Sequence, residues 1–167
     1  MNPTALAIID AAESRIKNAG YDGFSFREIA ADVGVKSASV HYHFPTKENL
    51  AAAVARRYGE RFLAEIEKEV AGGSDITAAW VATFRKAMHS DSRMCLCGAL
   101  GATSASLPPE VLAEARRFFE NGVQTLIDGG VSRAEAMHVI ATLEGAMLLA
   151  NVLGTTSAFD EASRGLA

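Results

Sequence analysis

Cysteine and proline are scarce in this chain, and it shows no membrane segment or signal peptide. Its 167 residues include only 2 cysteines and 4 prolines, which gives no disulfide framework and few interruptions of helices. The longest charge-free run near the C-terminus, residues 145–159, is shorter than a membrane span. The N-terminus carries Asp10 and Glu13 where a signal peptide needs an apolar core. We therefore expect a cytoplasmic protein with no membrane partner, in which Cys95 and Cys97 are reduced.

Basic residues are also in the minority, but their distribution is uneven. Residues 1–47 hold five basic and five acidic residues, whereas residues 48–167 hold 11 basic and 15 acidic ones, which gives the net charge of −4. Between Val33 and Lys47 there is no acidic residue at all. A local neutral-to-basic face on an acidic protein is compatible with nucleic-acid binding.

Apolar residues recur at three- and four-residue steps, which predicts an all-α fold. Two S-x-x-E sequences, Ser25–Glu28 and Ser132–Glu135, have the form of capping boxes that begin helices. The expected helices cover residues 4–18, 26–33, 37–44, 47–70, 76–90, 93–105, 108–127 and 134–153, followed by a short terminal helix. We predict a small N-terminal domain over residues 1–47 and a larger helical domain over residues 48–167.

The two short helices on either side of Gly34 suggest a helix-turn-helix. Glycine suits a turn that needs positive φ, and Ala30 falls where two crossing helices leave room only for a small side chain. The apolar residues of the motif fall where the helices must bury side chains: Ile29, Val33, Val35 and Val40. The alternative is a helical hairpin without a DNA-binding role.

The residues that follow make the motif more specific. The stretch "FSFREIAADVGVKSASVHYHFPTKENL" closely resembles the N-terminal DNA-binding domain of the TetR family of bacterial transcription regulators. Its most distinctive part is the run Tyr-x-Phe-x-x-Lys-x-x-Leu that starts at Tyr42. The resemblance covers residues 5–58 and implies a three-helix DNA-binding domain, followed by a helical domain that binds a ligand and forms a dimer.

The helix over residues 37–44 is then the expected recognition helix. A helix of this kind enters the major groove and presents side chains to base edges, and the candidates for that role are Lys36, Ser37, Ser39 and His41. The resemblance implies that Tyr42 and Lys47 contact phosphates, and Ser25 is a further phosphate candidate at a helix N-terminus. Tyr42 as a core tyrosine remains an alternative. A metal site at His41 and His43 would require a strand, because residues two apart on a helix point in different directions. We expect His43, Phe24, Phe26, Phe44 and Leu50 to pack within the small domain.

The larger domain is rich in bulky apolar side chains. In the family such helices enclose a pocket for a small apolar effector, and the candidates here are Trp80, Phe84, Met88, Cys95, Leu100, Phe119 and Met147. The alternative is a solid core. Cys95 and Cys97 are expected on one helix, either as buried packing residues or, for one of them, as a reactive sensor whose thiol pKa Arg93 lowers. His89 with these cysteines fits no zinc pattern, and we find no nucleophile–base pair, so we predict no metal, no cofactor and no enzyme activity.

Assembly follows from the size of a half-site. One recognition helix reads only a few base pairs, so we expect a homodimer. The helix over residues 134–153 carries apolar residues around most of its circumference, and with the C-terminal segment it is the predicted interface. Glu144 would then lie at the rim or pair with Arg133 or His138 of the other chain. The sequence thus indicates a DNA-binding regulator, expected to be a repressor released by a small molecule; the alternative is a helical enzyme or interaction protein with a helix-turn-helix as scaffold.

Overall fold

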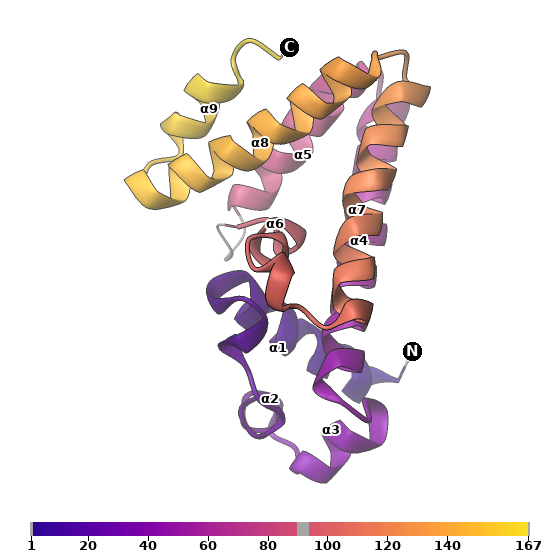
Figure 1. Ribbon diagram of the computed structural model, residues 1–167, viewed down its shortest axis with the longest axis vertical. Helices are drawn as coiled ribbons and strands as arrows, with labels where there is room; N and C mark the ends of the chain where they lie inside the picture. Colours follow the sequence, from indigo (N-terminus) through magenta and orange to yellow (C-terminus); the bar gives the residue numbers. More distant parts are fainter. Residues whose placement is uncertain (1, 90–93, 167) are drawn as a thin grey trace. The chain divides into compact units, whose positions relative to one another are not determined.

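The computed structural model describes residues 2–89 and 94–166. Within this part of the chain every regular element is helical (Figure 1), as the sequence predicts. The α-helices are α1 (Pro3–Ala19), α2 (Phe26–Val33), α3 (Ser37–His43), α4 (Lys47–Ala71), α5 (Ile76–His89), α6 (Leu96–Gly101), α7 (Pro109–Asp128), α8 (Arg133–Leu153) and α9 (Ser157–Ser163). Two 3₁₀ turns, η1 (Tyr21–Gly23) and η2 (Ser104–Ser106), connect them.

The chain forms two compact units. The first unit comprises Met1–Tyr58 and Leu96–Arg116, and the second comprises Gly59–Cys95 and Arg117–Ala167. Helices α4 and α7 therefore each contribute to both units. These units describe packing, and the functional division at residues 47 and 48 remains a prediction.

The core of the first unit forms around α1. Ile8, Ile9 and Ile16 are fully or almost fully buried on one face of this helix, as their three- and four-residue spacing predicts. Helix α1 packs against α2, α3 and α6. Phe24 and Leu50 are buried in the same unit, whereas Phe26 and Phe44 are only half-buried.

The predicted helix over residues 93–105 is shorter than expected. Helix α6 begins at Leu96 and ends at Gly101, and a separate 3₁₀ turn follows. The sequence "LCGALGATS" contains two glycines, which weaken a helix interior because they lose the most backbone entropy. Cys95 consequently lies before the helix, so the prediction that both cysteines share one helix was wrong.

An aromatic cluster forms the core of the second unit. The ring of Phe62 on α4 lies 5.8 Å from Trp80, 5.1 Å from Phe84 and 5.5 Å from Phe118, centroid to centroid. Two of these three pairs are edge-on, an arrangement that contributes roughly 0.5–1.5 kcal/mol per pair beyond the burial of area. Phe62 thus connects α4 with both α5 and α7.

Helix α8 has two different faces. Its inner face buries Val139, Leu143 and Met147, and packs on α5 and α9. Its outer face leaves large apolar side chains in solvent: Met137, Leu148, Leu149, Val152 and Leu153 are each at least half exposed. Ser132 begins the helix with a complete capping box to Glu135, as predicted.

Gly122 on α7 gives a test of this packing. A Cβ added there would lie 2.7 Å from Trp80 Cη2 and 3.1 Å from Ile140 Cδ1. We expect Gly122→Ala to lower the free energy of unfolding by about 1–3 kcal/mol because the core is overpacked. Gly59→Ala is the matched control, since its Cβ would meet Phe118 at an ordinary 3.5 Å. The control should gain up to about 1 kcal/mol from helix propensity. Urea unfolding of both variants measures the difference, and equal effects would contradict this description.

Candidate nucleic-acid interface

Helices α2 and α3 form a helix-turn-helix whose turn depends on Gly34. Gly34 has φ 75° and ψ 30°, the left-handed conformation that ends α2. The Val35 N–H then donates to the carbonyl oxygen of Ala30 at 2.9 Å, which closes the turn. Ile29, Ala30 and Val40 are buried, as the sequence predicts, whereas Val33 and Val35, which were also expected to be buried, are half-buried.

Helix α3 exposes four of its seven residues. Val40 is its only buried residue among the seven from Ser37 to His43. Lys36, Ser37 and His41 are exposed and Ser39 is half-buried. Helices α1 and α2 therefore pack against one side of α3. The other side presents hydroxyl, imidazole and ammonium groups, which can form hydrogen bonds with the edges of bases.

The three rings of α3 have distinct environments. The His41 imidazole lies edge-on to Phe26 of α2, with the ring centroids 4.6 Å apart, and this contact holds an exposed side chain in place. Tyr42 is 83% exposed, so the alternative of a core tyrosine does not apply. His43 is half-buried and packs edge-on against Tyr42 at 5.1 Å. The two histidines thus have different neighbours.

Lys47 lies at the start of α4 over two aromatic rings. Its Nζ is 4.5 Å from the ring centroid of Tyr21 and 4.8 Å from that of Phe24. Such cation–π contacts contribute about 0.5–1 kcal/mol at exposed sites, and they restrict where the ammonium can go. The sequence analysis missed this aromatic support, although both rings belong to the "GYDGF" connector that precedes α2.

The Glu48 carboxylate lies at the N-terminus of α4. The Tyr21 hydroxyl donates to Glu48 Oε1 at 3.1 Å, and the Glu48 carboxyl has a lowered pKa because its own backbone N–H and the Thr46 hydroxyl stabilise the charged form. Burial and this contact with Glu48 raise the pKa of Tyr21 to about 12. The helix N-terminus is therefore partly neutralised, and a phosphate here would depend mainly on the Lys47 ammonium.

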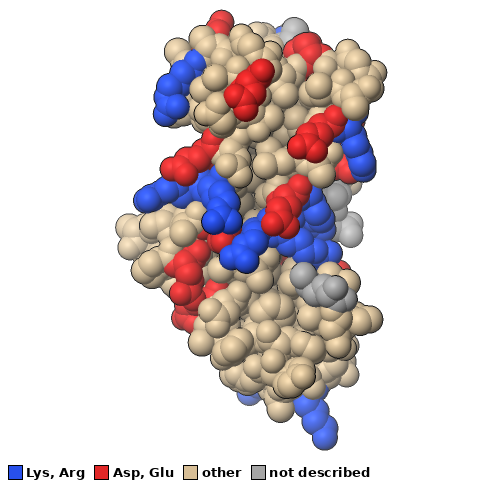
Figure 2. Space-filling model, turned by 90° about the vertical axis from the view of Figure 1, so that its right-hand side faces the viewer, with Lys and Arg blue, Asp and Glu red and all other residues tan. Residues whose placement is uncertain are grey.

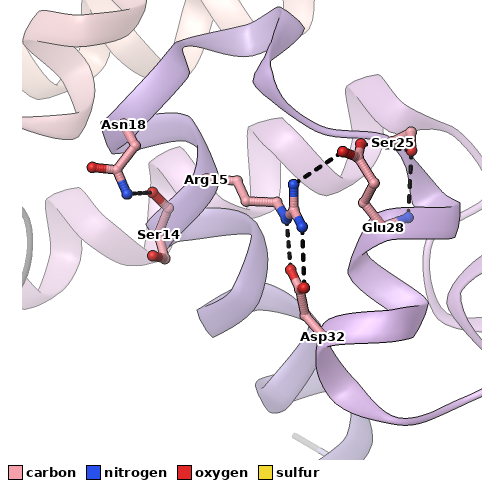
Figure 3. A network of polar contacts seen from close by, with 6 residues as sticks. All are labelled: Ser14, Arg15, Asn18, Ser25, Glu28 and Asp32. Carbon is pink, nitrogen blue, oxygen red and sulfur yellow. Dashed lines mark hydrogen bonds and ion pairs between the residues drawn. The ribbon is translucent and has the colours of Figure 1, made fainter.

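An ion-pair cluster fixes α2 against α1. Figure 3 shows the Arg15 guanidinium between Asp32 and Glu28, with N–O distances of 3.0 Å from Nη2 to Asp32 and 3.1 Å from Nη1 to Glu28. Arg15 lowers the pKa of the Asp32 carboxyl by this hydrogen bonding. The cluster was not predicted, because its members are up to 17 residues apart in sequence. These exposed ion pairs link α2 to α1.

Ser25 belongs to the same cluster and serves as the N-cap of α2. Its Oγ accepts the Glu28 N–H at 3.4 Å and donates to Glu28 Oε2 at 2.8 Å. The hydrogen bond from the Ser25 hydroxyl is the main reason that the pKa of Glu28 is lowered. The predicted cap is therefore present, and the phosphate role of Ser25 remains a prediction.

Charge on the surface follows the sequence pattern. On the face drawn in Figure 2, the lowest part of the first unit, where Figure 1 places α2 and α3, is mostly uncharged, and Lys or Arg side chains project at its tip. No Asp or Glu is visible at that tip. This agrees with the absence of acidic residues between Val33 and Lys47.

The predicted effector-pocket residues are mostly core. Trp80, Phe84, Cys95 and Leu100 are fully buried, Met88 and Met147 are nearly so, and Phe119 is half-buried. Leu100 belongs to the first unit and the other six belong to the second. Of the seven, Met88 lines a pocket of about 90 Å³, together with Ala150, Asn151, Gly154, Thr155 and Thr156. Whether these residues bind an effector stays a prediction.

The two thiols are buried and unbridged. The Cys95 thiol donates a hydrogen bond to the Glu144 carboxyl, and a neighbouring carboxylate disfavours a thiolate. This arrangement favours the packing interpretation over the sensor, and Arg93, the predicted activator, lies outside the described residues. Glu144 lies beside Cys95 of its own chain; its expected place at the rim of a dimer, or its pairing with Arg133 or His138 of the other chain, stays a prediction. Among residues 2–89 and 94–166, no group of three His, Cys, Asp or Glu side chains could hold a metal.

Comparisons with known proteins agree with this geometry. The family model of bacterial regulatory proteins of the tetR family matches residues 8–54. A TetR-family transcriptional regulator from Agrobacterium tumefaciens is 27% identical, with coverage of 97% of this chain and 94% of that one and a TM-score of 0.88. A TetR regulator from Legionella pneumophila is 28% identical, with coverage of 99% and 96% and a TM-score of 0.89. No curated protein shows a significant match.

Substitution of Ser25 tests its role as the N-cap of α2. We expect Ser25→Ala to lower the free energy of unfolding by about 1 kcal/mol, because the first turn of α2 loses its side-chain acceptor. Ser25→Thr keeps the acceptor and should remain close to the original stability. Ser37→Ala is the matched control, since α3 has no side-chain cap bond. Thermal unfolding compares the stabilities of the three variants. A Ser25→Ala protein as stable as the original would show that the Ser25 side chain does not stabilise α2 as a cap.

Proposed function

The chain belongs to the TetR family of bacterial regulatory proteins and is a DNA-binding transcriptional regulator, and we propose that it is a repressor which a small-molecule effector releases from its operator. The observation that carries the proposal is the outer side of α3. Exposed polar side chains stand there on a helix with one buried residue and no acidic neighbour between Val33 and Lys47. The protein acts in the cytoplasm, where the DNA of a bacterium lies.

Contacts to DNA divide into two groups. Lys36, Ser37, Ser39 and His41 read base edges in the major groove. Tyr42 and Lys47 bind phosphates and set the register, and Ser25 adds a phosphate contact beside its role as a cap. The exposure of Tyr42 and the support of Lys47 by two aromatic rings favour these roles. The contact with Phe26 orients the His41 ring for its proposed role as a base reader.

Binding measured against salt distinguishes the two groups. Lys47→Ala should weaken binding to all DNA sequences alike and reduce the slope of log K against log salt by about one, because one phosphate contact is lost. His41→Ala should instead relax specificity at one base position and cost roughly 1–3 kcal/mol on the operator alone. Fluorescence anisotropy on the operator and on a scrambled duplex gives both quantities.

Matched controls keep this experiment interpretable. Tyr42→Phe keeps the ring and removes only the hydroxyl, so it should weaken both duplexes without changing the preference between them. Lys68→Ala removes an exposed lysine of α4 that pairs with Glu65 in the second unit, and it should change nothing. If Lys47→Ala and Tyr42→Phe both bind DNA like the original protein, these phosphate contacts are not made.

We further propose that the protein is a homodimer through α8 and the C-terminal segment. Monomers rarely leave a contiguous apolar patch of this kind in solvent. Met137, Ala141, Leu148 and Val152 are all exposed and follow each other at helical spacing along the outer side of α8. Helix α8 is also long and apolar enough to cross a membrane by length and composition, with 39% of the tested window buried. Its buried inner face and central Glu144 favour a second copy of this chain as the covering partner.

Charged substitutions on α8 test the dimer. Leu148→Glu combined with Leu149→Lys should convert the dimer to monomer at micromolar concentration, because the interface loses two apolar side chains that are half exposed in the isolated chain. Val70→Glu is the control, since it alters an apolar residue on α4 that is 41% exposed. Sedimentation velocity reads the result. A dimer that persists in the α8 variant, or a monomeric original protein, would contradict the interface.

The second reading is a helical enzyme or interaction protein in which the helix-turn-helix is only scaffold. It predicts no salt-dependent shift on duplex DNA. A search for a palindrome in the DNA upstream of the coding region, followed by titration with that duplex, decides between the two. Repression itself needs a reporter under that promoter, with and without the protein.

A further inference from the structure

Three polar atoms in the second unit are buried without a hydrogen-bond partner among the described residues. They are Nε1 of Trp80, Oγ1 of Thr83 and Oε1 of Glu144. More than nine tenths of buried polar groups in native proteins have a partner, so a group of three is an indication that something is bound there. Glu144 is half-buried as a residue, and the buried atom is its inner carboxyl oxygen.

The three residues belong to two helices that pack against each other. Trp80 and Thr83 are one turn apart on α5, and α5 packs side by side with α8 (Figure 1). The Trp80 ring of α5 and Ile140 of α8 both border the position of Gly122. Nearer the C-terminal ends of the same two helices, Met88 of α5 and Ala150 of α8 line one pocket. The two helices therefore run in the same direction, and the level midway between these points carries Thr83 on α5 and Glu144 on α8.

The Glu144 carboxyl has few polar neighbours among the described residues. Within residues 2–89 and 94–166, the Cys95 thiol, a weak donor, makes a hydrogen bond with the Glu144 carboxyl, and Oε1 has no partner. Leu143 and Met147, its neighbours on α8, are buried and apolar, and so is Phe84 on α5. Burial raises the pKa of Glu144 to about 7, so the carboxyl loses much of its charge unless a donor compensates it. A buried carboxylate is stable when a cation pairs with it.

We propose that Glu144 and Thr83 form the polar end of the effector site and select an effector with a primary ammonium group on an apolar body. The inference rests on the proposed release by an effector and names the class of that effector. The ammonium donates to Glu144 Oε1 and to Thr83 Oγ1, and the body extends along α5 and α8 toward the pocket of about 90 Å³ at Met88. Met88 and Met147 are adaptable side chains that can move to enlarge that space. This proposal narrows the expected small apolar effector to one whose apolar body carries a primary ammonium group.

Trp80 gives a direct reading of this site, because it is the only tryptophan in the chain. The probes are n-hexylamine, 1-hexanol and hexanoate, which share one body and differ in the head group. Titrated at neutral pH, hexylamine should change the Trp80 emission at a concentration at least about tenfold lower than hexanol does, as a hydrogen bond to a charged group implies. Hexanoate should bind more weakly than either, because it brings a second negative charge to Glu144.

Variants identify the carboxyl. Glu144→Gln should lose the preference for amine over alcohol, while Glu161→Gln, which alters an exposed carboxyl on α9, should keep it. Thr83→Val should reduce the preference while keeping the shape of the side chain. If Glu144→Gln does not fold, the comparison of the three probes on the original protein still decides. Equal responses to hexylamine and hexanol would overturn the proposal and leave Glu144 as a protonated or water-bound core residue.

Release of DNA is measured separately with the same probes. If the amine binds but the operator complex stays intact, the proposed binding site is supported and the proposed release of DNA by this class of effector is contradicted. If the protein binds DNA but the Trp80 emission shows no preference for the amine, the proposed amine site is contradicted and the proposed regulator function is not affected. Potassium chloride at the same ionic strength is the control for screening of the DNA contacts.

Discussion

The close crossing of α2 over α3 is the constraint on which the DNA-binding face depends. Helix α3 has seven residues and one buried side chain, Val40, so it has little stability of its own. Its position follows from the left-handed Gly34, from the small Ala30 at the crossing, and from the backbone hydrogen bond that closes the turn. A larger side chain at position 30 would separate the helices and move every polar group on α3 at once.

The local placement of charges explains how a protein with a negative net charge can bind DNA, which is also negatively charged. The chain has a net charge of −4, so long-range attraction to DNA is weak and affinity must arise locally. Acidic residues of the first unit are partly held in internal pairs, as Asp32 and Glu28 are by Arg15. Lys47, in contrast, is held by aromatic rings, which position the ammonium without neutralising it. The acid-free stretch between Val33 and Lys47 thus offers DNA the exposed Lys36 and the ring-supported Lys47.

Sequence reasoning worked where the determinants are local. The caps at Ser25 and Ser132, the left-handed turn at Gly34 and the extent of α2 all follow from residues within a few positions of each other. It failed at α6, where two glycines shortened the helix and placed Cys95 outside it. The Arg15 cluster and the aromatic support of Lys47 were also missed, because their members come together only through the tertiary fold. Propensity and spacing carry no information on such contacts.

Helix α8 shows how one sequence pattern can have two causes. Its apolar residues surround most of the helix, which a single buried face does not require. The inner residues pack within the second unit, and the outer ones are exposed on the isolated chain. The sequence predicts Glu144 at the rim of a dimer or paired with Arg133 or His138 of the other chain, and this stays a prediction. Within its own chain the carboxyl contacts Cys95, which lies before α6, and spacing along α8 carries no information on that contact. The proposed effector contact at Glu144 and the proposed dimer contact at Leu148 are one turn apart on the same helix, so a displacement of α8 at one site would also move the other.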